Sequence, residues 1–299
     1  MATTHSPVLL DESMELLAVR PGGFYVDGTV GLGGHAHEIL MRSAPDGRLL
    51  GLDRDAETLE RAKERLAFFG GRVRLVHGDY RELPEVLGGV RPDGVILDLG
   101  VSSAQLDDPE RGFSFQAEGP LDMRMDRSRG ESAREVVNRM PEDELADVIY
   151  RFGEERASRR IARAIAEARK RAPISTTTEL AAIVRRAARR PGRSRLDPAT
   201  RSFQAIRIQV NREIAGLGDS LGTIAACLAL GGRMAVIAFH SLEDREVKLR
   251  FRSLTHEGFR LLTKKPVRPS EAEVDRNPRA RSARLRAIER LRADEEAAA

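Results

Sequence analysis

A cluster of glycines between a short apolar strand and a helix constrains the fold of this chain more than any other feature. Residues 24–26 have the composition of a buried strand, Asp27 ends it, and four glycines follow between residues 28 and 34. A helical pattern then runs over residues 35–41, with its apolar side chains on one face. A chain that passes from strand through glycine into helix brings its backbone close to a ligand and directs the first helical N–H groups at it. The pattern predicts a ligand-binding turn packed on a sheet.

The spacing of the glycines indicates which ligand this turn serves. It reads G-x-x-G-x-G-G over residues 28–34, which is not the dinucleotide pattern G-x-G-x-x-G. A second strand, residues 48–52, ends in Asp53, and an acid at this position accepts hydrogen bonds from ribose hydroxyls. The glycine turn and Asp53 thus both indicate a nucleoside, and neither of them indicates a pyrophosphate. We expect S-adenosylmethionine rather than NAD, and a purely structural turn is the alternative.

The alternation of strands and helices continues along the chain and favours a parallel sheet. Residues 73–77 and 94–98 are the third and fourth expected strands, and residues 233–239 are the fifth. Tyr80, just past the third strand, is the candidate for stacking on an adenine ring, with Asp79 beside it for the adenine amino group. The alternative for Tyr80 is a position in the core. Ligands of open α/β sheets bind at the carboxyl edge, where these residues lie.

The alternation stops between the fourth and fifth strands. Residues 105–127 form a polar loop that is too long for an ordinary connector, so we expect it to be functional. We therefore expect an α/β domain over residues 1–104 and 212–299, interrupted by an all-helical domain over residues 105–211. The further helices expected are 132–139, 142–152, 154–171, 177–188, 199–210, 221–230 and 243–252. Two final strands are expected at 259–265 and 282–288, joined by a mobile connection, residues 266–281.

The net charge of +4 is unevenly distributed. Residues 1–123 carry a net charge of −9, residues 124–215 carry +9, and residues 216–299 carry +4. Only five of the 50 basic residues are lysines, and arginine makes forked contacts to phosphates and stacks on bases. Biased composition with solvated helix faces explains the preference for arginine equally well, but it explains the regional asymmetry less well. The central block is therefore a candidate surface for nucleic acid.

The single cysteine, Cys227, excludes a disulfide framework and the ligand spacing of a zinc site, and we expect no metal. The sequence shows no signal peptide and no apolar run of membrane length, so we expect a cytoplasmic protein without membrane contact. It leaves the oligomeric state open, and a homodimer is one state that it allows.

Several motifs together resemble one bacterial family, the ribosomal RNA small subunit methyltransferase H or MraW family. The matching stretches cover nearly the whole chain, and the long loop motifs are specific. They are His5-x-Pro7-Val8-Leu9-Leu10-Asp11-Glu12, Asp27-Gly28-Thr29, Gly33-Gly34-His35, Leu52-Asp53-Arg54-Asp55, Leu97–Ser103, Gln105-Leu106-Asp107, Arg111–Phe115, Gly119–Met125, Gly153–Arg156, Thr200–Ala205, Phe239–Arg245 and Asn277–Ser282.

The resemblance implies an α/β fold of the class I S-adenosylmethionine-dependent methyltransferases, Rossmann-like with a mostly parallel sheet, and an inserted all-helical substrate-recognition domain. It implies methylation of the N4 amino group of a cytidine in the decoding region of small-subunit (16S) rRNA, within the ribosomal subunit. The cofactor contacts that it carries over are Gly33, Gly34, His35, Asp53, Tyr80, Asp98 and Gln105. Many family members have Phe where this chain has Tyr80, and the aromatic face is kept.

Asp98 is also the candidate catalytic residue, as acceptor of a hydrogen bond from the target amino group. Many amino-methyltransferases place Pro-Pro-aromatic after this residue, whereas here Leu99-Gly100-Val101 follows. Asp98 is therefore alternatively a cofactor ligand alone, with Ser102, Ser103 and His240 as other contacts to the base or as structural caps. A basic clamp on RNA phosphates would draw on arginines of the central block, namely Arg124, Arg127, Arg156, Arg159, Arg160, Arg185 and Arg186.

Two other classes of function stay open at this stage. The first is a methyltransferase that acts on DNA or on a small molecule, since a basic domain suits DNA as well as RNA. The second is a non-catalytic RNA-binding or ribosome-assembly factor that has kept the fold. The intact Gly33, Gly34 and Asp53 argue against the second class.

Overall fold

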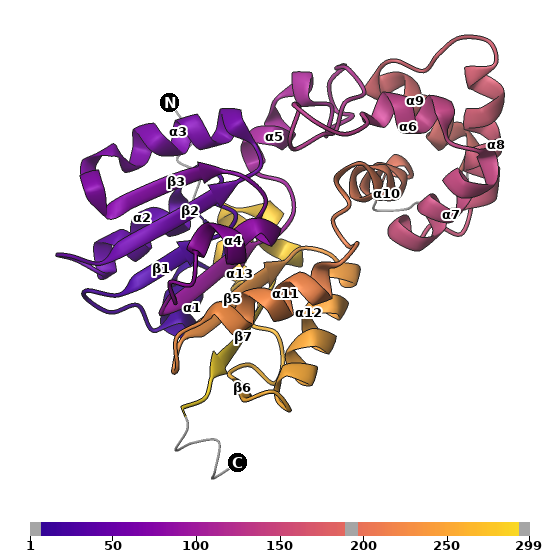
Figure 1. Ribbon diagram of the computed structural model, residues 1–299. Helices are drawn as coiled ribbons and strands as arrows, with labels where there is room; N and C mark the ends of the chain where they lie inside the picture. The colour runs from indigo at the N-terminus through magenta and orange to yellow at the C-terminus, as the bar shows by residue number, and fades with distance from the viewer. Residues whose placement is uncertain (1–6, 189–196, 293–299) are drawn as a thin grey trace. The chain divides into compact units, whose positions relative to one another are not determined.

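The computed structural model describes residues 7–188 and 197–292, and His5 lies outside them. Two compact units are present (Figure 1). The sheet unit comprises residues 1–100 and 216–299, and the helical unit comprises residues 101–215. From the sequence, the two domain boundaries were expected between residues 104 and 105 and between residues 211 and 212. No helix among the described residues is both long and apolar enough to cross a membrane.

A seven-stranded sheet with the order β3-β2-β1-β4-β5-β7-β6 forms the centre of the sheet unit. The strands from β3 to β5 are parallel, and β7 is antiparallel to both β5 and β6. This confirms the five expected central strands and the mostly parallel α/β fold. The strands are β1 (Phe24–Asp27), β2 (Arg48–Asp53), β3 (Val73–His77), β4 (Gly94–Asp98), β5 (Arg233–Ala238), β6 (Phe259–Leu261) and β7 (Arg284–Arg290).

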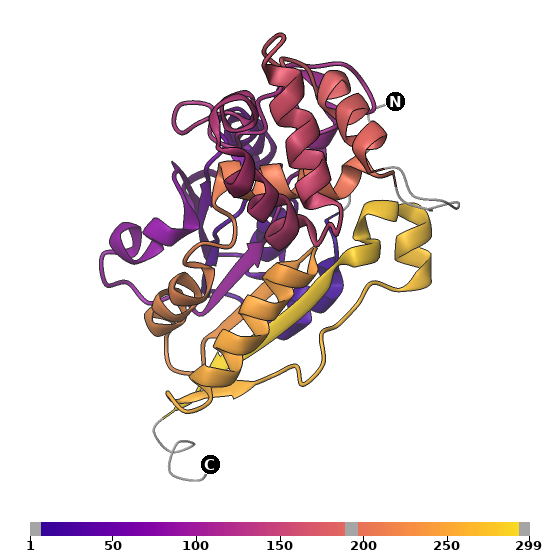
Figure 2. The ribbon, with the colours of Figure 1, turned by 90° about the vertical axis from the view of Figure 1, so that its right-hand side faces the viewer.

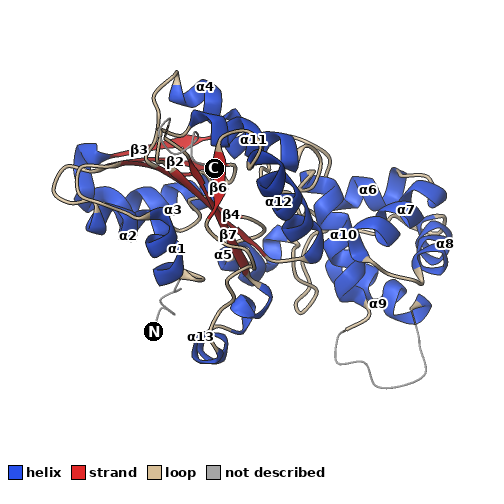
Figure 3. Cartoon of the chain, turned by 90° about the horizontal axis from the view of Figure 1, so that it is seen from below, coloured by secondary structure: helices blue, strands red, loops and turns tan. Residues whose placement is uncertain are grey.

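Helices cover both faces of this sheet, as the view along its edge shows (Figure 3). Successive residues of a strand point to opposite faces, so Val26 packs in one core and Tyr25 in the other. One face carries α1 (Leu10–Leu17), α2 (Gly34–Arg42) and α3 (Ala56–Leu66), and the other carries α4 (Leu83–Leu87), α11 (Leu217–Cys227) and α12 (Ser241–Leu254). Because the central strands are buried on both sides, they read as continuous apolar runs.

The structure differs from the sequence-based prediction at three places in the sheet unit. The connection 266–281 contains α13 (Glu271–Arg276) and a 3₁₀ helix, Pro278–Ser282, where a mobile segment was expected. The short helix α4 was not expected. The helix expected at 221–230 spans Leu217–Cys227, and the carbonyl oxygens of Ala226 and Leu228 at its end accept hydrogen bonds from Arg290 Nη1 (2.9 and 2.7 Å).

The helical unit packs its helices around a separate apolar core that includes Leu145, Ile161, Leu180 and Ile206. Its helices are α5 (Ser103–Asp107), α6 (Ala133–Arg139), α7 (Glu142–Gly153), α8 (Ser158–Arg169), α9 (Thr177–Ala187) and α10 (Ala199–Asn211). Capping boxes at Ser132 and Thr176 fix the starts of α6 and α9. The described residues of this unit form no strand beyond an isolated bridge between Pro120 and Thr176.

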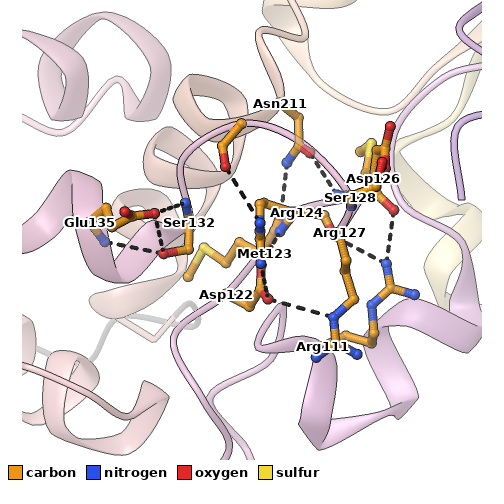
Figure 4. Close-up of polar contacts among 12 residues, drawn as sticks. Arg111, Asp122, Met123, Arg124, Asp126, Arg127, Ser128, Ser132, Glu135 and Asn211 are labelled. Atoms are coloured by element: carbon orange, nitrogen blue, oxygen red, sulfur yellow. Dashed lines mark hydrogen bonds and ion pairs between the residues drawn. The ribbon is translucent and has the colours of Figure 1, made fainter.

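The long polar loop of the helical unit is held in one conformation by side chains (Figure 4). Met123 lies in the left-handed region with φ 60°, and the Asn211 side chain binds the backbone of Met123 and of Met125. Asn211 Oδ1 accepts from the Met125 N–H at 2.8 Å, and Nδ2 donates to the Met123 carbonyl at 2.7 Å. Arg111 Nη2 donates to the carbonyls of Arg124 and Met125, both at 3.0 Å. The loop is therefore an ordered part of its unit.

Candidate functional site

Three neighbouring parallel strands of the sheet unit each end in an aspartate. Asp27 ends β1, Asp53 ends β2 and Asp98 ends β4, and the three strands are adjacent in the order β2-β1-β4. Parallel strands have their carboxyl ends at one edge, so the three carboxyl groups share that edge. This is the edge at which open α/β sheets bind ligands.

The glycine turn after β1 is bonded to both neighbouring strands. The Gly28 N–H donates to the Ile96 carbonyl on β4 at 3.0 Å, and the Val30 N–H donates to the Leu52 carbonyl on β2 at 2.9 Å. Gly33 is the residue before α2 and has φ 78°, a conformation that glycine adopts without steric cost. Backbone hydrogen bonds to β2 and β4 therefore fix the turn at the edge of the sheet that carries the three aspartates.

Asp53 accepts hydrogen bonds from two backbone donors. The Gly31 N–H lies 2.7 Å from Oδ2, and the Asp55 N–H lies 2.8 Å from Oδ1. Burial raises the pKa of the Asp53 carboxyl above its ordinary value, although these two donors act in the opposite direction. Each carboxylate oxygen has a further lone pair, so Asp53 can also accept hydrogen bonds from a ligand diol.

Asp27 is 1% exposed and only partly satisfied. Its Oδ1 accepts from the Thr29 N–H at 3.1 Å, whereas its buried Oδ2 has no hydrogen-bond partner among the described residues. Burial is the main cause that raises the pKa of Asp27 to about 7, and the charge of Asp53 adds to it. A positive charge at this edge would favour the ionised form.

Asp98 is the third carboxyl group at this edge, and it too is only partly satisfied. Its side chain is 26% exposed, yet Oδ1 is buried and has no hydrogen-bond partner among the described residues. Burial, followed by the charges of Asp27 and Glu243, raises its pKa well above the ordinary value. Its Oδ2 lies 3.9 Å from Nδ1 of His35, and its backbone N–H donates to Oγ1 of Thr29 at 2.6 Å.

His35 and Gly34 sit at the start of α2 against the N-terminal segment. His35 is 6% exposed, and its Nε2 lies 3.1 Å from the Val8 carbonyl. A Cβ on Gly34 would come within 2.4 Å of Pro7 Cγ, so only glycine fits there. The structure thus brings Gly33, Gly34 and His35 to the edge that carries Asp53 and Asp98.

Tyr80 lies in the core, which was the alternative reading for this residue. It is 6% exposed and belongs to the same apolar cluster as Leu83 and Leu97. The Arg81 guanidinium carbon lies 4.8 Å from the centre of its ring, and burial raises the pKa of Tyr80 to about 12. The Asp79 carboxylate is bound by Arg54 and by Arg81. Contacts of Tyr80 and Asp79 with adenine stay predictions.

Three of the other candidate residues, Ser102, Gln105 and His240, take part in helix caps. Ser102 and Gln105 form a capping box at α5, in which the Ser102 N–H donates to Gln105 Oε1 at 2.9 Å. Ser103 is the first residue of that helix. His240 forms a capping box with Glu243 at α12. Gln105 belongs to the helical unit, and its role toward the cofactor stays a prediction.

The group that fits this edge carries a diol and positive charge. Two buried aspartate oxygens without hydrogen-bond partners among the described residues, together with three raised carboxyl pKa values, favour a cationic ligand. S-adenosylmethionine has such a diol in its ribose, and it carries two cations, its sulfonium and its ammonium group. Asp27 was absent from the set of site residues expected from the sequence. The signal was available, because Asp27 ends its strand as Asp53 and Asp98 end theirs.

The strand order, the antiparallel β7 and the glycine turn beside three strand-ending acids define a class I S-adenosylmethionine-dependent methyltransferase. The model of the MraW methylase family matches residues 2–291. The chain therefore belongs to the MraW methylase family.

Two relatives illustrate how similar the family members are over their whole length. The chain is 51% identical to the ribosomal RNA small subunit methyltransferase H of Syntrophobacter fumaroxidans, over 97% of each protein. It is 50% identical to the protein of the same name from Symbiobacterium thermophilum, over 99% of this chain and 100% of the relative.

Proposed function

We propose that this methyltransferase acts on small-subunit (16S) rRNA, at the N4 amino group of a cytidine in the decoding region. The observation that carries the proposal is the identity of about half of all positions, over nearly full length, with relatives named as ribosomal RNA small subunit methyltransferases. The net charge of +9 on residues 124–215 supports an RNA substrate, because phosphates dominate the affinity of nucleic-acid complexes.

The chemistry requires an acceptor for hydrogen bonds from the cytosine amino group, whose lone pair is delocalised into the ring. S-adenosylmethionine supplies the activated methyl group. The Asp98 carboxylate is the proposed acceptor, and its raised pKa makes the ionised form a stronger base. Asp98 is also a proposed contact of the cofactor. The other proposed cofactor contacts are Gly33, Gly34, His35, Asp53, Tyr80 and Gln105.

The helical unit is the proposed substrate-recognition domain, and its arginines differ in how strongly acids already hold them. Arg124 is held by Asp122 through Nε at 2.7 Å and Nη2 at 3.0 Å, and Arg185 is paired with Asp197 at 2.9 Å. Arg156 and Arg186 are exposed. They have no ion pair with any residue that the structure describes, which leaves them the more favourable phosphate ligands of the set.

The ribosomal subunit is the proposed context of the reaction, and it places the enzyme in the cytoplasm. The target base must be presented out of its stack, and a clamp on flanking phosphates helps to hold it there. A homodimer is the proposed alternative to a monomer, and sedimentation of the purified protein distinguishes the two.

Transfer of labelled methyl groups tests the substrate. Purified protein is incubated with labelled S-adenosylmethionine and, separately, with small subunits, naked 16S rRNA and DNA, and the modified nucleoside is identified by mass. We expect N4-methylcytidine in rRNA and a steep decrease of RNA affinity with salt. Label in DNA alone would contradict the proposal, and absence of both transfer and cofactor binding would indicate a non-catalytic assembly factor.

A further inference from the structure

A basic pocket lies in the sheet unit on the side of α12, apart from the carboxyl edge of the sheet. Its volume is about 330 Å³, and Figure 2 shows α12 lying along β7, where the pocket forms. The lining residues come from α12, from β6 and the segment after it, and from β7. They are Lys248, Phe251, Arg252, Leu261, Thr263, Lys264 and Arg286.

Three of the four cations that line this pocket have no ion-pair partner among the described residues, and the fourth, Arg286, is paired. Lys248, Arg252 and Lys264 are exposed, and they form no ion pair with any described residue. Arg286 is 7% exposed and donates through Nε to Asp244 Oδ1 at 2.7 Å. Asp244 also accepts from Arg284 at 3.0 Å, so one carboxylate serves two guanidinium groups. No Asp or Glu is among the lining residues.

The lysines of the chain make this pocket distinct. Of the five lysines, Lys63 is paired with Glu60 at 2.5 Å and Lys170 with Glu167 at 2.6 Å. Lys248 and Lys264 line the pocket, and the fifth lysine follows Lys264 directly. Two of the five lysines therefore line the pocket without an ion-pair partner among the described residues, and lysine binds phosphate as a point charge.

The shape and the polar groups of the pocket suit a phosphate rather than a base. Phe251 is 1% exposed and offers no ring face for stacking. The Thr263 hydroxyl oxygen accepts from the Ala287 N–H at 3.0 Å, which leaves the hydroxyl proton for a ligand. Arg245 precedes Lys248 by three residues and Arg252 by seven, so the three cations share one face of α12. A row of cations suits a row of phosphates.

We propose that this pocket and the α12 face bind backbone phosphates of the substrate RNA, as a second contact surface besides the arginines of the helical unit. This inference rests on the proposed function, since it names a further contact with the same RNA. The sheet unit then contributes to holding the substrate as well as the cofactor.

The double variant Lys248→Gln, Lys264→Gln tests the pocket in the full-length protein. Binding to a small-subunit rRNA fragment is measured at several salt concentrations. We expect several-fold weaker binding and a salt slope reduced by roughly 1 for each lost phosphate contact. The charge-conserving variant Lys248→Arg, Lys264→Arg should restore the slope. Lys63→Gln is the matched control, because Lys63 lies on α3 of the same unit and is already paired with Glu60.

Three outcomes decide the matter. A slope and affinity equal to those of the wild type overturn the pocket assignment. Weakened binding to intact small subunits with unchanged binding to naked rRNA overturns it too, because a ribosomal protein is then the partner. Loss of affinity in the Gln variant, with rescue by Arg, supports it. The proposed function is judged separately, by methyl transfer of the wild-type enzyme, so each idea fails on its own measurement.

Discussion

The backbone N–H of Gly31 donates a hydrogen bond of 2.7 Å to Oδ2 of Asp53. This bond joins the glycine turn after β1 to the acid that ends β2, so the two parts of the proposed cofactor site hold each other in place. A carboxylate whose orientation is fixed before the ligand arrives loses less conformational freedom on binding. The relationship gives the proposed cofactor site its first test.

Asp53→Asn should weaken S-adenosylmethionine binding. The amide has one acceptor oxygen where the carboxylate has two, so the Gly31 or the Asp55 N–H loses its acceptor, and so does any ribose hydroxyl bound to the same oxygen. We expect a loss of roughly 1–3 kcal/mol, or about fivefold to 150-fold in Kd, by calorimetry. Glu60→Gln on the exposed face of α3 is the control and should leave the affinity unchanged. Equal affinities of all three proteins would remove Asp53 from the site.

Gly33→Ala should reduce cofactor affinity more than a matched substitution elsewhere. Gly33 has φ 78° and Gly88 has φ 55°, and both lie in the left-handed region, so alanine is strained at both positions by about 1 kcal/mol. A Cβ at Gly33 also lies 3.3 Å from Leu66, whereas one at Gly88 has nothing within 4 Å. Both variants should lose stability, and only Gly33→Ala should lose cofactor affinity. Parallel losses of affinity would mean that the turn acts through stability alone.

Asp27 should make the stability of the ligand-free protein depend on pH. Its pKa is raised from 3.8 to about 7, so the folded state holds a proton that the unfolded state releases. The protonated form is tolerated at low pH, and stability is lost as pH rises through that interval. Asp27→Asn removes this penalty and should stabilise the ligand-free protein at pH 8 by up to about 4 kcal/mol, and by less at pH 5.

The same substitution should act oppositely on the cofactor. In the wild type a proton on Asp27 competes with a cationic ligand, so affinity should rise with pH up to about 7. In Asp27→Asn the affinity for the cofactor should be lower and should depend less on pH. Chemical denaturation and calorimetry at pH 5 and pH 8 check both effects. A variant that is no more stable than the wild type at pH 8 would show that burial does not strain this carboxyl group.

Asp98→Asn separates catalysis from cofactor binding. As proton acceptor Asp98 should contribute about 10²–10⁴-fold, so kcat should fall by that factor at saturating S-adenosylmethionine. Ser132→Ala is the comparison, since it removes an equivalent helix cap, at α6, worth about 1 kcal/mol and should leave kcat unaltered. If Asp98→Asn raises only the cofactor Kd, the residue binds the cofactor and the acceptor lies elsewhere.

The central sheet could be predicted from the sequence because its strands are short apolar runs that end in polar residues. Gly94–Asp98 shows this most clearly, and the matching acids at Asp53 and Asp98 follow from the same pattern. The direction of β7 could not be predicted, since alternation is the same in parallel and antiparallel strands. Its place between β5 and β6 depends on pairing with residues about 50 positions away in the chain, such as Arg233 with Glu289.

The surroundings of the site residues were harder to predict than their positions. Tyr80 lies just past β3 as expected, but only the fold shows that it is buried in the core, with the Arg81 guanidinium over its ring. The Asp79 carboxylate is bound by Arg54, which directly follows β2. At the end of α11, the Leu228 carbonyl oxygen likewise accepts from the Arg290 side chain, which is distant in sequence. A sequence pattern shows which polar side chains lie near a site, whereas tertiary contacts decide which of them already have a hydrogen-bond or ion-pair partner.

A crystal structure with S-adenosylmethionine bound tests the central claim most directly. The account predicts the ribose hydroxyls within hydrogen-bond distance of the Asp53 carboxylate, with the cofactor against the glycine turn, residues 28–34. Cofactor bound at another edge of the sheet, or a ribose remote from Asp53, would contradict it.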